Sequence, residues 1–382
     1  MSKGLTGSLH WTSKQASLPY TSITIFFVIS MVIFGKIQDE KGPRYTVTIG
    51  SLLMGTGLIL SGLFTDPKIM ILTMGVIAGA GMGAINASTT PPAVKWFPLE
   101  KKGMVTGIVV GGVGISSVFY SPLANYLINT VGISNTFIYI GIGALIITLL
   151  LAQLLDNPPK NFAVENNDRI DQKLVETAKD VTWREMLKTK NFYKLWIMLA
   201  LSSSAGLMIV GHVANITKVQ VNWEAGFILV MLLSIFNALG RILGGTISDK
   251  IGRLSMMKVV FIMQALNMFS FHWYTNVALL SFGVALTGLC YGAGFSVFPA
   301  TATDLYGMKN FGLNYGLVFT GWGVGGIIGP MTAAAIFDAT NSYNLAYTIA
   351  GALLILTILI AFTFKVKAGS SGIGALSTLD HA

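Results

Sequence analysis

The chain has 382 residues, of which 53% are hydrophobic and 11% are charged, whereas an ordinary soluble domain carries about 25% charged residues. This composition excludes a water-soluble globular protein, and the net charge of +9 indicates nucleic-acid binding only if the basic residues gather in one patch. The single cysteine, Cys290, lies in an apolar run, which excludes a disulfide framework and a cysteine-rich metal site.

Apolar runs long enough to cross a membrane follow one another along nearly the whole chain. A membrane-spanning helix needs roughly 20 mainly apolar residues, and eleven such runs occur. We predict spans at 19–37, 44–64, 69–94, 104–127, 134–156, 191–215, 225–247, 255–274, 277–303, 311–336 and 343–364. The predicted fold class is therefore an all-α membrane protein with eleven transmembrane helices.

The loops between these predicted spans differ in charge on the two sides of the membrane. One set holds most of the basic residues, including a stretch from Lys160 to Lys194, whereas the other holds Lys68 and Lys218. Because loops rich in Lys and Arg face the cytoplasm, the rich side is predicted to be cytoplasmic. The net charge therefore reflects membrane topology, and we expect no nucleic-acid partner.

A polar segment divides the chain into two parts. Asp156–Thr189 carries charges of both signs, so it cannot stay in hydrocarbon and is predicted to be a cytoplasmic linker. We expect an N-terminal helical bundle at 1–156, a linker at 157–190, a C-terminal six-helix bundle at 191–368 and a cytoplasmic tail at 369–382.

A short pattern recurs on either side of the linker and indicates two related halves. It reads Gly35-Lys-Ile-Gln-Asp39-Glu-Lys-Gly42-Pro-Arg44 and Gly245-Thr-Ile-Ser-Asp249-Lys-Ile-Gly252-Arg253. The second copy closes the second span of its half, whereas the first copy follows the first span. We therefore expect the N-terminal half to lack one helix before Pro19, with five spans against six, and the start of the chain to be truncated.

The loop pattern and the two halves resemble the major facilitator superfamily over about His10 to Phe364. Three further phrases support the resemblance, namely Ala93-Val-Lys95-Trp96-Phe97-Pro98, Asn314-Tyr315-Gly-Leu and Gly329-Pro330. Within the superfamily, the sequence is most similar to the oxalate/formate antiporter family, which includes bacterial lactate and pyruvate carriers. The resemblance implies twelve helices in two pseudo-symmetric six-helix bundles, around a central cavity that opens to each side in turn.

The acidic and basic residues of the repeated pattern can pair across a tight turn that its glycines permit. The resemblance implies that these residues hold the cytoplasmic side shut while the outer side is open. The predicted gating residues are Asp39, Gly42, Arg44, Gly245, Asp249, Gly252 and Arg253. The alternative is a set of ordinary loop charges that follow the positive-inside rule.

Among the Lys and Arg residues, only Arg241 falls well inside a predicted span. A mid-span arginine costs at least about 2.5 to 3.5 kcal/mol on insertion scales, so it needs a partner or a function. All 16 acidic residues lie in loops or near span ends, and a planar guanidinium without a counter-charge is suited to a carboxylate. The alternative is a side chain that snorkels to the membrane surface.

The resemblance agrees with this interpretation, since carboxylate carriers place an anion-binding arginine in the corresponding helix. Animal monocarboxylate carriers often have an acid one turn earlier, where this chain has Asn237. Oxalate carriers have a second cation in the penultimate helix, where this chain has Trp322, which we also predict to contact the substrate. A single positive charge favours a monoanion, such as lactate, pyruvate or formate, over oxalate.

Four more residues are predicted to bind the substrate from the two halves. Tyr291 and Phe295 lie one helical turn apart and share a face, and they resemble the family's aromatic residues over the substrate. Ordinary packing is the alternative for this pair. Asn86 and Ser88 are candidates for hydrogen bonds to substrate oxygens from the N-terminal half.

His212 is the other titratable residue that falls inside a predicted span, and it is also a predicted substrate-binding residue, because an imidazole can carry a proton near neutral pH. A role as a satisfied hydrogen-bond partner is the alternative. Since no carboxylate is predicted inside the membrane, a proton relay is not visible in the sequence. Proton symport and anion exchange therefore both remain open.

Small residues recur four positions apart within several spans, as at Gly240 and Gly244, and allow close helix packing. They lie in apolar helices, and the sequence has no phosphate-binding loop, so ATP is not the expected energy source. No metal box, nucleophile elbow or acid–base pair indicates an enzyme, a metal or a cofactor.

We therefore expect a monomeric, multi-pass protein of the inner cell membrane that contacts the lipid bilayer. Its predicted function is secondary active transport of a small carboxylate anion by alternating access. An efflux carrier for drugs or other solutes of the same superfamily is one alternative, and a truncated, non-transporting membrane protein is another.

Overall fold

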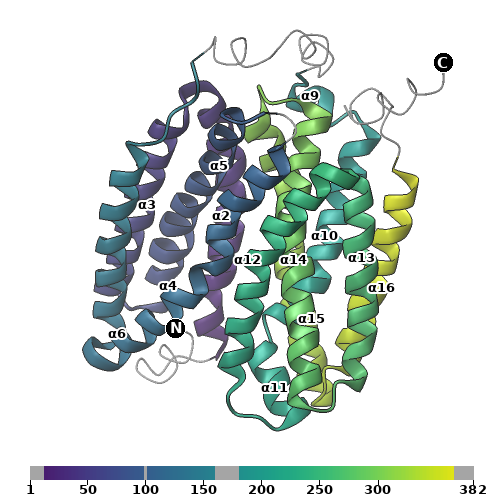
Figure 1. Ribbon diagram of the computed structural model, residues 1–382. Coiled ribbons are helices and arrows are strands. Elements are labelled where there is room, and N and C mark those ends of the chain that lie inside the picture. Colours follow the sequence, from purple (N-terminus) through teal and green to yellow (C-terminus); the bar gives the residue numbers. More distant parts are fainter. Residues whose placement is uncertain (1–12, 99–100, 160–179, 365–382) are drawn as a thin grey trace, which may run out of the picture.

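The computed structural model describes residues 13–98, 101–159 and 180–364, in which long helices run side by side along one axis (Figure 1). The described residues contain helices and no strand. Residues 1–12, most of the predicted linker and the predicted tail at 369–382 lie outside the described ranges. We call the end of the molecule that carries α9 (Trp183–Met186), at the top of Figure 1, the linker end, and the opposite end, which carries α11 (Val213–Val221), the far end.

The N-terminal half runs from α2 to α6. Its elements are α2 (Ser13–Lys41), α3 (Pro43–Leu63), α4 (Pro67–Met70), the π-helix η1 (Ile71–Ala78), α5 (Gly79–Lys95) and α6 (Lys102–Ala152). A small apolar core joins α3, α4, η1 and α6; it contains Leu58, Met70, Ala78, Ile133 and Phe137.

The C-terminal half runs from α9 to α16. Its elements are α9 (Trp183–Met186), α10 (Lys190–Val210), α11 (Val213–Val221), α12 (Gly226–Ile251), α13 (Arg253–Ser270), the 3₁₀ turn η3 (Phe271–Trp273), α14 (Val277–Tyr306), α15 (Phe311–Thr340) and α16 (Asn344–Thr363). The larger apolar core of the protein lies mainly among these helices and also includes Val28 and Met31 of α2 and Ala87 of α5.

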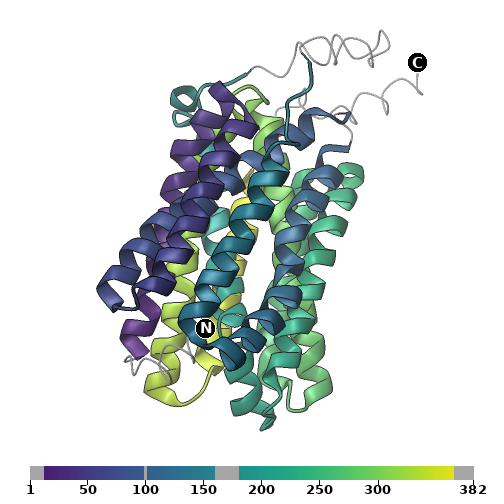
Figure 2. The ribbon, with the colours of Figure 1, turned by 90° about the vertical axis from the view of Figure 1, so that its left-hand side faces the viewer.

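In the described residues, 10 helices are long and apolar enough to cross a membrane. This count agrees with the eleven predicted spans once α6, of 51 residues, is divided at its kink, because α6 contains two of them, at 104–127 and 134–156. Gly132 lies inside it with φ 79° and ψ 169°, a backbone conformation that glycine adopts without steric cost. The chain reverses there without a separate loop, and Figure 2 shows the two arms of α6 side by side.

The predicted span at 191–215 is also different in the structure. The membrane helix α10 ends at Val210, and the chain turns at Gly211 and His212 before α11 begins. His212 therefore lies in a turn at the far end of α10, not inside a span.

Close contact between α12 and α14 positions the centre of the molecule. A side chain at Gly240 would overlap the carbonyl oxygen of Leu289, and one at Gly292 would overlap that of Asn237. Small residues let the two backbones touch, as the spacing predicts. This contact places Arg241 of α12 next to Phe295 of α14.

Candidate functional site

Arg241 lies at the contact between the two halves, with 5% of its surface exposed. Its Nε donates to Oδ1 of Asn237 at 2.8 Å, and Nη1 donates to the backbone carbonyl of Val110 in α6 at 2.7 Å. Its Cζ lies 4.3 Å from the centroid of the Phe295 ring, which is within the range of a cation–π contact. The guanidinium is held inside the protein, so the snorkelling alternative does not describe it.

A cavity of about 310 Å³ opens beside this guanidinium, between α6, α10, α11 and α12. Its polar wall consists of Ser234, Asn237 and Arg241, and the rest of the lining is Val113, Gly114, Val210, Val213, Val230 and Leu233. Pockets for small molecules are commonly apolar, with a few polar groups that orient the ligand. This cavity has that character, with one positive charge.

The charge of Arg241 is not neutralised by a neighbouring acid. None of the ion pairs among the described residues includes Arg241, and no acidic side chain lines the cavity. Its two hydrogen bonds go to uncharged oxygens and use Nε and one Nη1 hydrogen. The remaining N–H groups at the Nη end have no acceptor among the described residues, and they are the groups that a carboxylate binds end-on.

An aromatic cluster lies against Arg241 and includes three of the predicted residues, Tyr291, Phe295 and Trp322. Nε1 of Trp322 donates to the hydroxyl of Tyr291 at 2.8 Å, and the ring centroids of Tyr291 and Phe295 are 5.2 Å apart. Phe319 stacks on Trp322 at 5.0 Å, and Phe27 of α2 packs on Trp322 at 5.9 Å. The cluster therefore joins the two halves of the protein.

Asn86 and Ser88 are not brought to this site. Ser88 is fully buried, and its hydroxyl donates to the carbonyl of Ala84 one turn back in α5. Asn86 is partly buried and, like Ser88, does not line the cavity beside Arg241. The structure gives no contact that joins these two residues to the guanidinium.

His212 is likewise outside the cavity that Arg241 lines. Its Nε2 lies 3.0 Å from the carbonyl oxygen of Pro330, and its Nδ1 lies 3.3 Å from the hydroxyl of Tyr343. These contacts join the turn after α10 to α15 and to the start of α16. They match the hydrogen-bonding alternative for this histidine.

The two copies of the repeated pattern both lie at the linker end, where each carboxylate binds a helix start in the other half. The oxygens of Asp39 accept from the backbone N–H groups of Gly312 and Leu313 in α15, each at 3.0 Å. Those of Asp249 accept from Gly103 and Met104 in α6, at 3.0 and 2.9 Å. A carboxylate at a helix N-terminus is stabilised by unpaired N–H groups and by the helix dipole.

Glycines make both of these contacts close. Gly35 meets the backbone of Gly312, and Gly245 meets that of Gly103, so that any side chain at Gly35 or Gly245 would overlap the opposite helix. Gly42 and Gly252 follow the carboxylates with φ of 87° and 89°, values that L-residues with side chains rarely adopt. We call the contact of Asp39 with α15 the first latch and that of Asp249 with α6 the second latch.

The predicted acid–base pair forms in the second latch but not in the first. Nη1 of Arg253 lies 2.5 Å from Oδ1 of Asp249, and its Nε lies 3.0 Å from Asp304. Arg44 instead approaches Asp156 at 3.7 Å, where both side chains are exposed. The pairing predicted for Asp39 and Arg44 is therefore wrong.

Sequence reasoning missed four participants in these sites. Asp304 and Lys102 extend the second latch, with their charged atoms 3.7 Å apart; each is a charged residue near a predicted span end, which was the available signal. Phe27 could be recognised in the sequence only as one of many apolar residues in the first predicted span. Val110 contributes a backbone carbonyl, which no residue type could indicate.

The chain is similar in sequence to known membrane transporters. A model of the Major Facilitator Superfamily matches residues 1–284 and, in a second overlapping match, residues 215–375. The oxalate:formate antiporter of Oxalobacter formigenes is 28% identical over 320 residues, covering 82% of this chain and 74% of the relative. A protein of Escherichia coli (strain K12) named "Uncharacterized MFS-type transporter YhjX" is 26% identical over 326 residues, covering 85% and 79%.

Solved structures show the same fold. The proton:xylose symporter XylE has a TM-score of 0.76 to this chain at 13% identity, over 95% of this chain and 90% of XylE. The predicted all-α fold is thereby confirmed, as are the resemblance to an oxalate/formate antiporter and the expectation of a transporter in place of an enzyme. Because the family model matches nearly the whole chain, the protein belongs to the major facilitator superfamily.

Proposed function

We propose that this secondary transporter exchanges small monocarboxylate anions, with Arg241 as the carboxylate-binding residue. The observation that carries the proposal is a buried guanidinium that lines a cavity without an acidic partner. A carboxylate that binds end-on to the Nη groups would neutralise that charge and satisfy its N–H donors. The relative named as an oxalate:formate antiporter supports this class of substrate.

The lining of the cavity favours a monoanion with a small apolar body. Arg241 is its one positively charged side chain, and Val113, Val230 and Leu233 are among the apolar residues that face the same space. A dianion would bring a second charge into this apolar lining without a partner, which is costly. Lactate and pyruvate therefore fit the site better than oxalate, and formate fits its charge while leaving much of the cavity unfilled.

Anion exchange is favoured over proton symport by the electrostatics of the empty site. Closing both sides of an empty carrier would seal an unneutralised charge away from water, which costs several kcal/mol for a typical buried ion. A bound anion removes this cost, so the loaded carrier changes conformation more readily than the empty one. Asn237 accepts the hydrogen bond from Nε of Arg241, and its amide does not ionise. It therefore cannot neutralise Arg241 by losing a proton, as a carboxylic acid in a proton symporter could.

We further propose that the linker end faces the cytoplasm. The basic loops lie at this end of the predicted topology, and loops rich in Lys and Arg stay on the cytoplasmic side. Both latches also lie there, so the described conformation would be closed toward the cytoplasm. The C-terminus and the linker would then be cytoplasmic.

Reconstitution into liposomes tests the proposal. Vesicles that contain unlabelled lactate, pyruvate, formate or oxalate, or no anion, are compared for uptake of the labelled anions. We expect saturable uptake of labelled lactate or pyruvate only into vesicles preloaded with a transported anion. A proton gradient that drives uptake into empty vesicles would instead indicate symport.

Two variants assign the role of the guanidinium. Arg241→Ala should abolish uptake, and Arg241→Lys should retain charge but bind the anion more weakly, because an ammonium lacks the planar fork. Lys218→Ala removes an exposed cation at the far end and is the matched control. Folded protein that transports none of the anions, or transport that survives Arg241→Ala, would contradict the proposal.

A further inference from the structure

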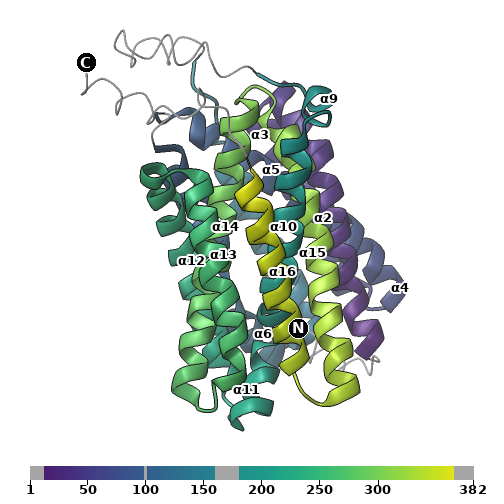
Figure 3. The same cartoon turned by 90° about the vertical axis from the view of Figure 1, so that its right-hand side faces the viewer.

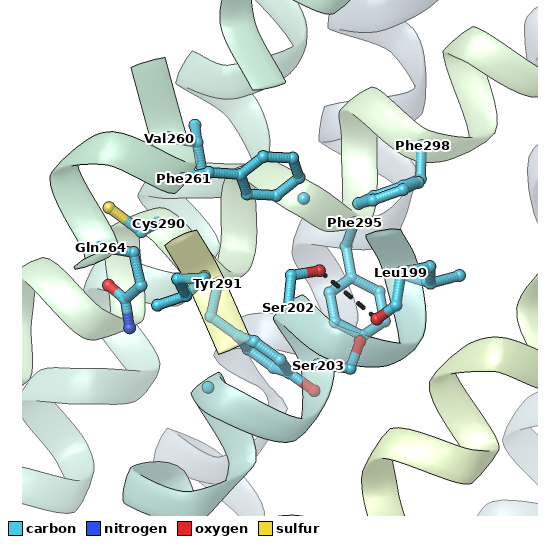
Figure 4. Close-up of a pocket in the computed structure, with 13 residues that line it drawn as sticks. Leu199, Ser202, Ser203, Val260, Phe261, Gln264, Cys290, Tyr291, Phe295 and Phe298 are labelled. Atoms are coloured by element: carbon cyan, nitrogen blue, oxygen red, sulfur yellow. Dashed lines mark hydrogen bonds between the residues drawn. The ribbon is translucent and has the colours of Figure 1, made fainter. Parts of the chain in front are cut away.

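Helices α10, α13, α14 and α16 lie together in the C-terminal half (Figure 3). A second cavity, of about 30 Å³, is lined by residues of these four helices (Figure 4). We call it the rear chamber. Its deep wall is formed by buried side chains, namely Val260, Phe261, Gln264, Cys290, Phe298 and Leu354. Tyr291 and Phe295 form its partly exposed side, so the chamber lies directly behind the aromatic cluster that contacts Arg241.

Gln264 is the polar group that distinguishes this chamber from a packing defect. Its side chain is 4% exposed, and neither its Nε2 nor its Oε1 has a hydrogen-bond partner among the described residues. Figure 4 shows the amide on the chamber wall beside Tyr291. A primary amide offers donors and an acceptor together, and buried amides in folded proteins nearly always find partners.

Hydroxyl groups on α10 complete a polar lining. The Oγ of Ser202 donates to the carbonyl of Met198 at 2.7 Å, which leaves its oxygen able to accept from a ligand. Ser203 also lines the chamber. A ligand that bridges Gln264 and these hydroxyls must both donate and accept hydrogen bonds.

The size of the chamber limits that ligand to water. A water molecule needs about 10 to 15 Å³ of this kind of volume, and polar cavities that offer it several partners are filled, whereas apolar ones stay dry. A chamber of about 30 Å³ thus has room for a pair of waters, and not for an organic anion or a lipid chain. We propose that the rear chamber is a water-binding site in which ordered water hydrogen-bonds to the Gln264 amide and the α10 hydroxyls.

This site would make water a structural part of the C-terminal half, behind the residues proposed to contact substrate. It does not depend on the identity of the transported solute. Water held there would satisfy the amide at the point where α13 faces α14. It would also keep a polar layer between Tyr291 and the apolar core.

Oxidation of Cys290 can report water in the rear chamber, because Cys290 is the single cysteine of the chain and lines the chamber. Brief X-ray irradiation produces hydroxyl radicals from water in place, and a thiol in contact with that water is oxidised, which mass spectrometry measures. We expect Cys290 of the intact, reconstituted protein to be oxidised several-fold faster than a buried cysteine without adjacent water. Ala333→Cys in a Cys290→Ala background supplies that reference, since Ala333 is 0% exposed in the apolar core.

Gln264→Leu replaces the amide with an apolar group of similar size and should reduce Cys290 oxidation to the reference level. Even if Gln264→Leu does not fold, the oxidation rate of Cys290 relative to the reference cysteine shows whether the rear chamber holds water. Oxidation of Cys290 at the reference rate would overturn the proposal, because it would mean a dry chamber. Fast oxidation that Gln264→Leu leaves unchanged would also overturn it, because the water would then not be bound by the amide.

Discussion

The two latches at the linker end use the same backbone contacts but different charges. In each, a carboxylate accepts two N–H groups from the start of a helix in the other half. In the second latch, Arg253 also joins Asp249 to Asp304. In the first latch, no ion pair within 4 Å reaches Asp39 among the described residues, and Lys95 contributes only a longer-range attraction.

A single proline explains why the copies diverge. After the positive-φ glycine, α13 begins with Arg253, whereas α3 begins with Pro43 and has its arginine one residue later. One residue turns a helix by about 100°, so Arg44 points away from Asp39 and approaches Asp156. Proline is favoured at this first helical position because it needs no N–H partner there.

The residues before the two carboxylates differ as well. Ser248 donates to the carbonyl of Gly245 at 2.7 Å and accepts from Arg253 at 2.6 Å. Gln38, at the equivalent position, is 1% exposed, and both of its amide atoms lack partners among the described residues. Among the described residues, the first latch therefore contains an unsatisfied amide and has no ion pair, so we expect it to open before the second latch.

The largest effect should follow from breaking the second latch at Arg253. Arg253→Gln leaves the partly buried Asp249 without its ion-pair partner and leaves Asp304 with Lys102 alone. Loss of one partner of a buried pair costs about 3 to 5 kcal/mol. Thermal unfolding in detergent should show this loss of stability, and an unchanged unfolding temperature would contradict the proposed strength of the second latch.

Neutralising the carboxylates compares the two latches directly. Asp249→Asn and Asp39→Asn each weaken two hydrogen bonds to backbone N–H groups, and bonds to charged groups are worth about 1.5 to 3 kcal/mol. Asp249→Asn should cost more, since it also leaves Arg253 with one acid fewer. The accessibility of an engineered cysteine at the linker end measures opening, and equal effects would mean that the latches are equivalent.

Removing the unsatisfied amide of Gln38 should stabilise the closed linker end, whereas the preceding substitutions destabilise it. Gln38→Leu eliminates buried polar atoms whose desolvation costs about 1 to 3 kcal/mol, so it should stabilise the closed linker end and slow transport. Ser248→Ala is the matched change in the second latch and should destabilise it, because it removes two hydrogen bonds. The same cysteine-accessibility assay should report shifts of opposite sign for the two variants.

The smallest effect is expected at Arg44. Its contact with Asp156 joins side chains that are 53% and 73% exposed, and such surface pairs contribute about 0 to 1 kcal/mol. Arg44→Ala should change neither the unfolding temperature nor transport measurably. A large loss on this substitution, comparable to that of Arg253→Gln, would show that the first latch depends on Arg44 after all.

Local features of the sequence were sufficient to predict most of the spans and the positions of both latches. Hydropathy depends only on residues that are neighbours in the sequence. Gly42 and Gly252 form turns because glycine adopts a positive φ, which is also a local property. The error in span layout, at 191–215, arose where a turn interrupts an apolar stretch. The turn at Gly211 ends α10 before the apolar residues do, whereas the reversal at Gly132 falls between two predicted spans, as expected.

By itself, the sequence determined that the chain is an all-helical membrane protein with one isolated interior cation, Arg241, because composition, periodicity and charge position are all local. The tertiary structure decided what that cation and the latches touch. Val110 lies 131 residues from Arg241, and Gly312 lies 273 residues from Asp39. Such partners depend on how two bundles pack against each other, and no pattern along one segment carries that information.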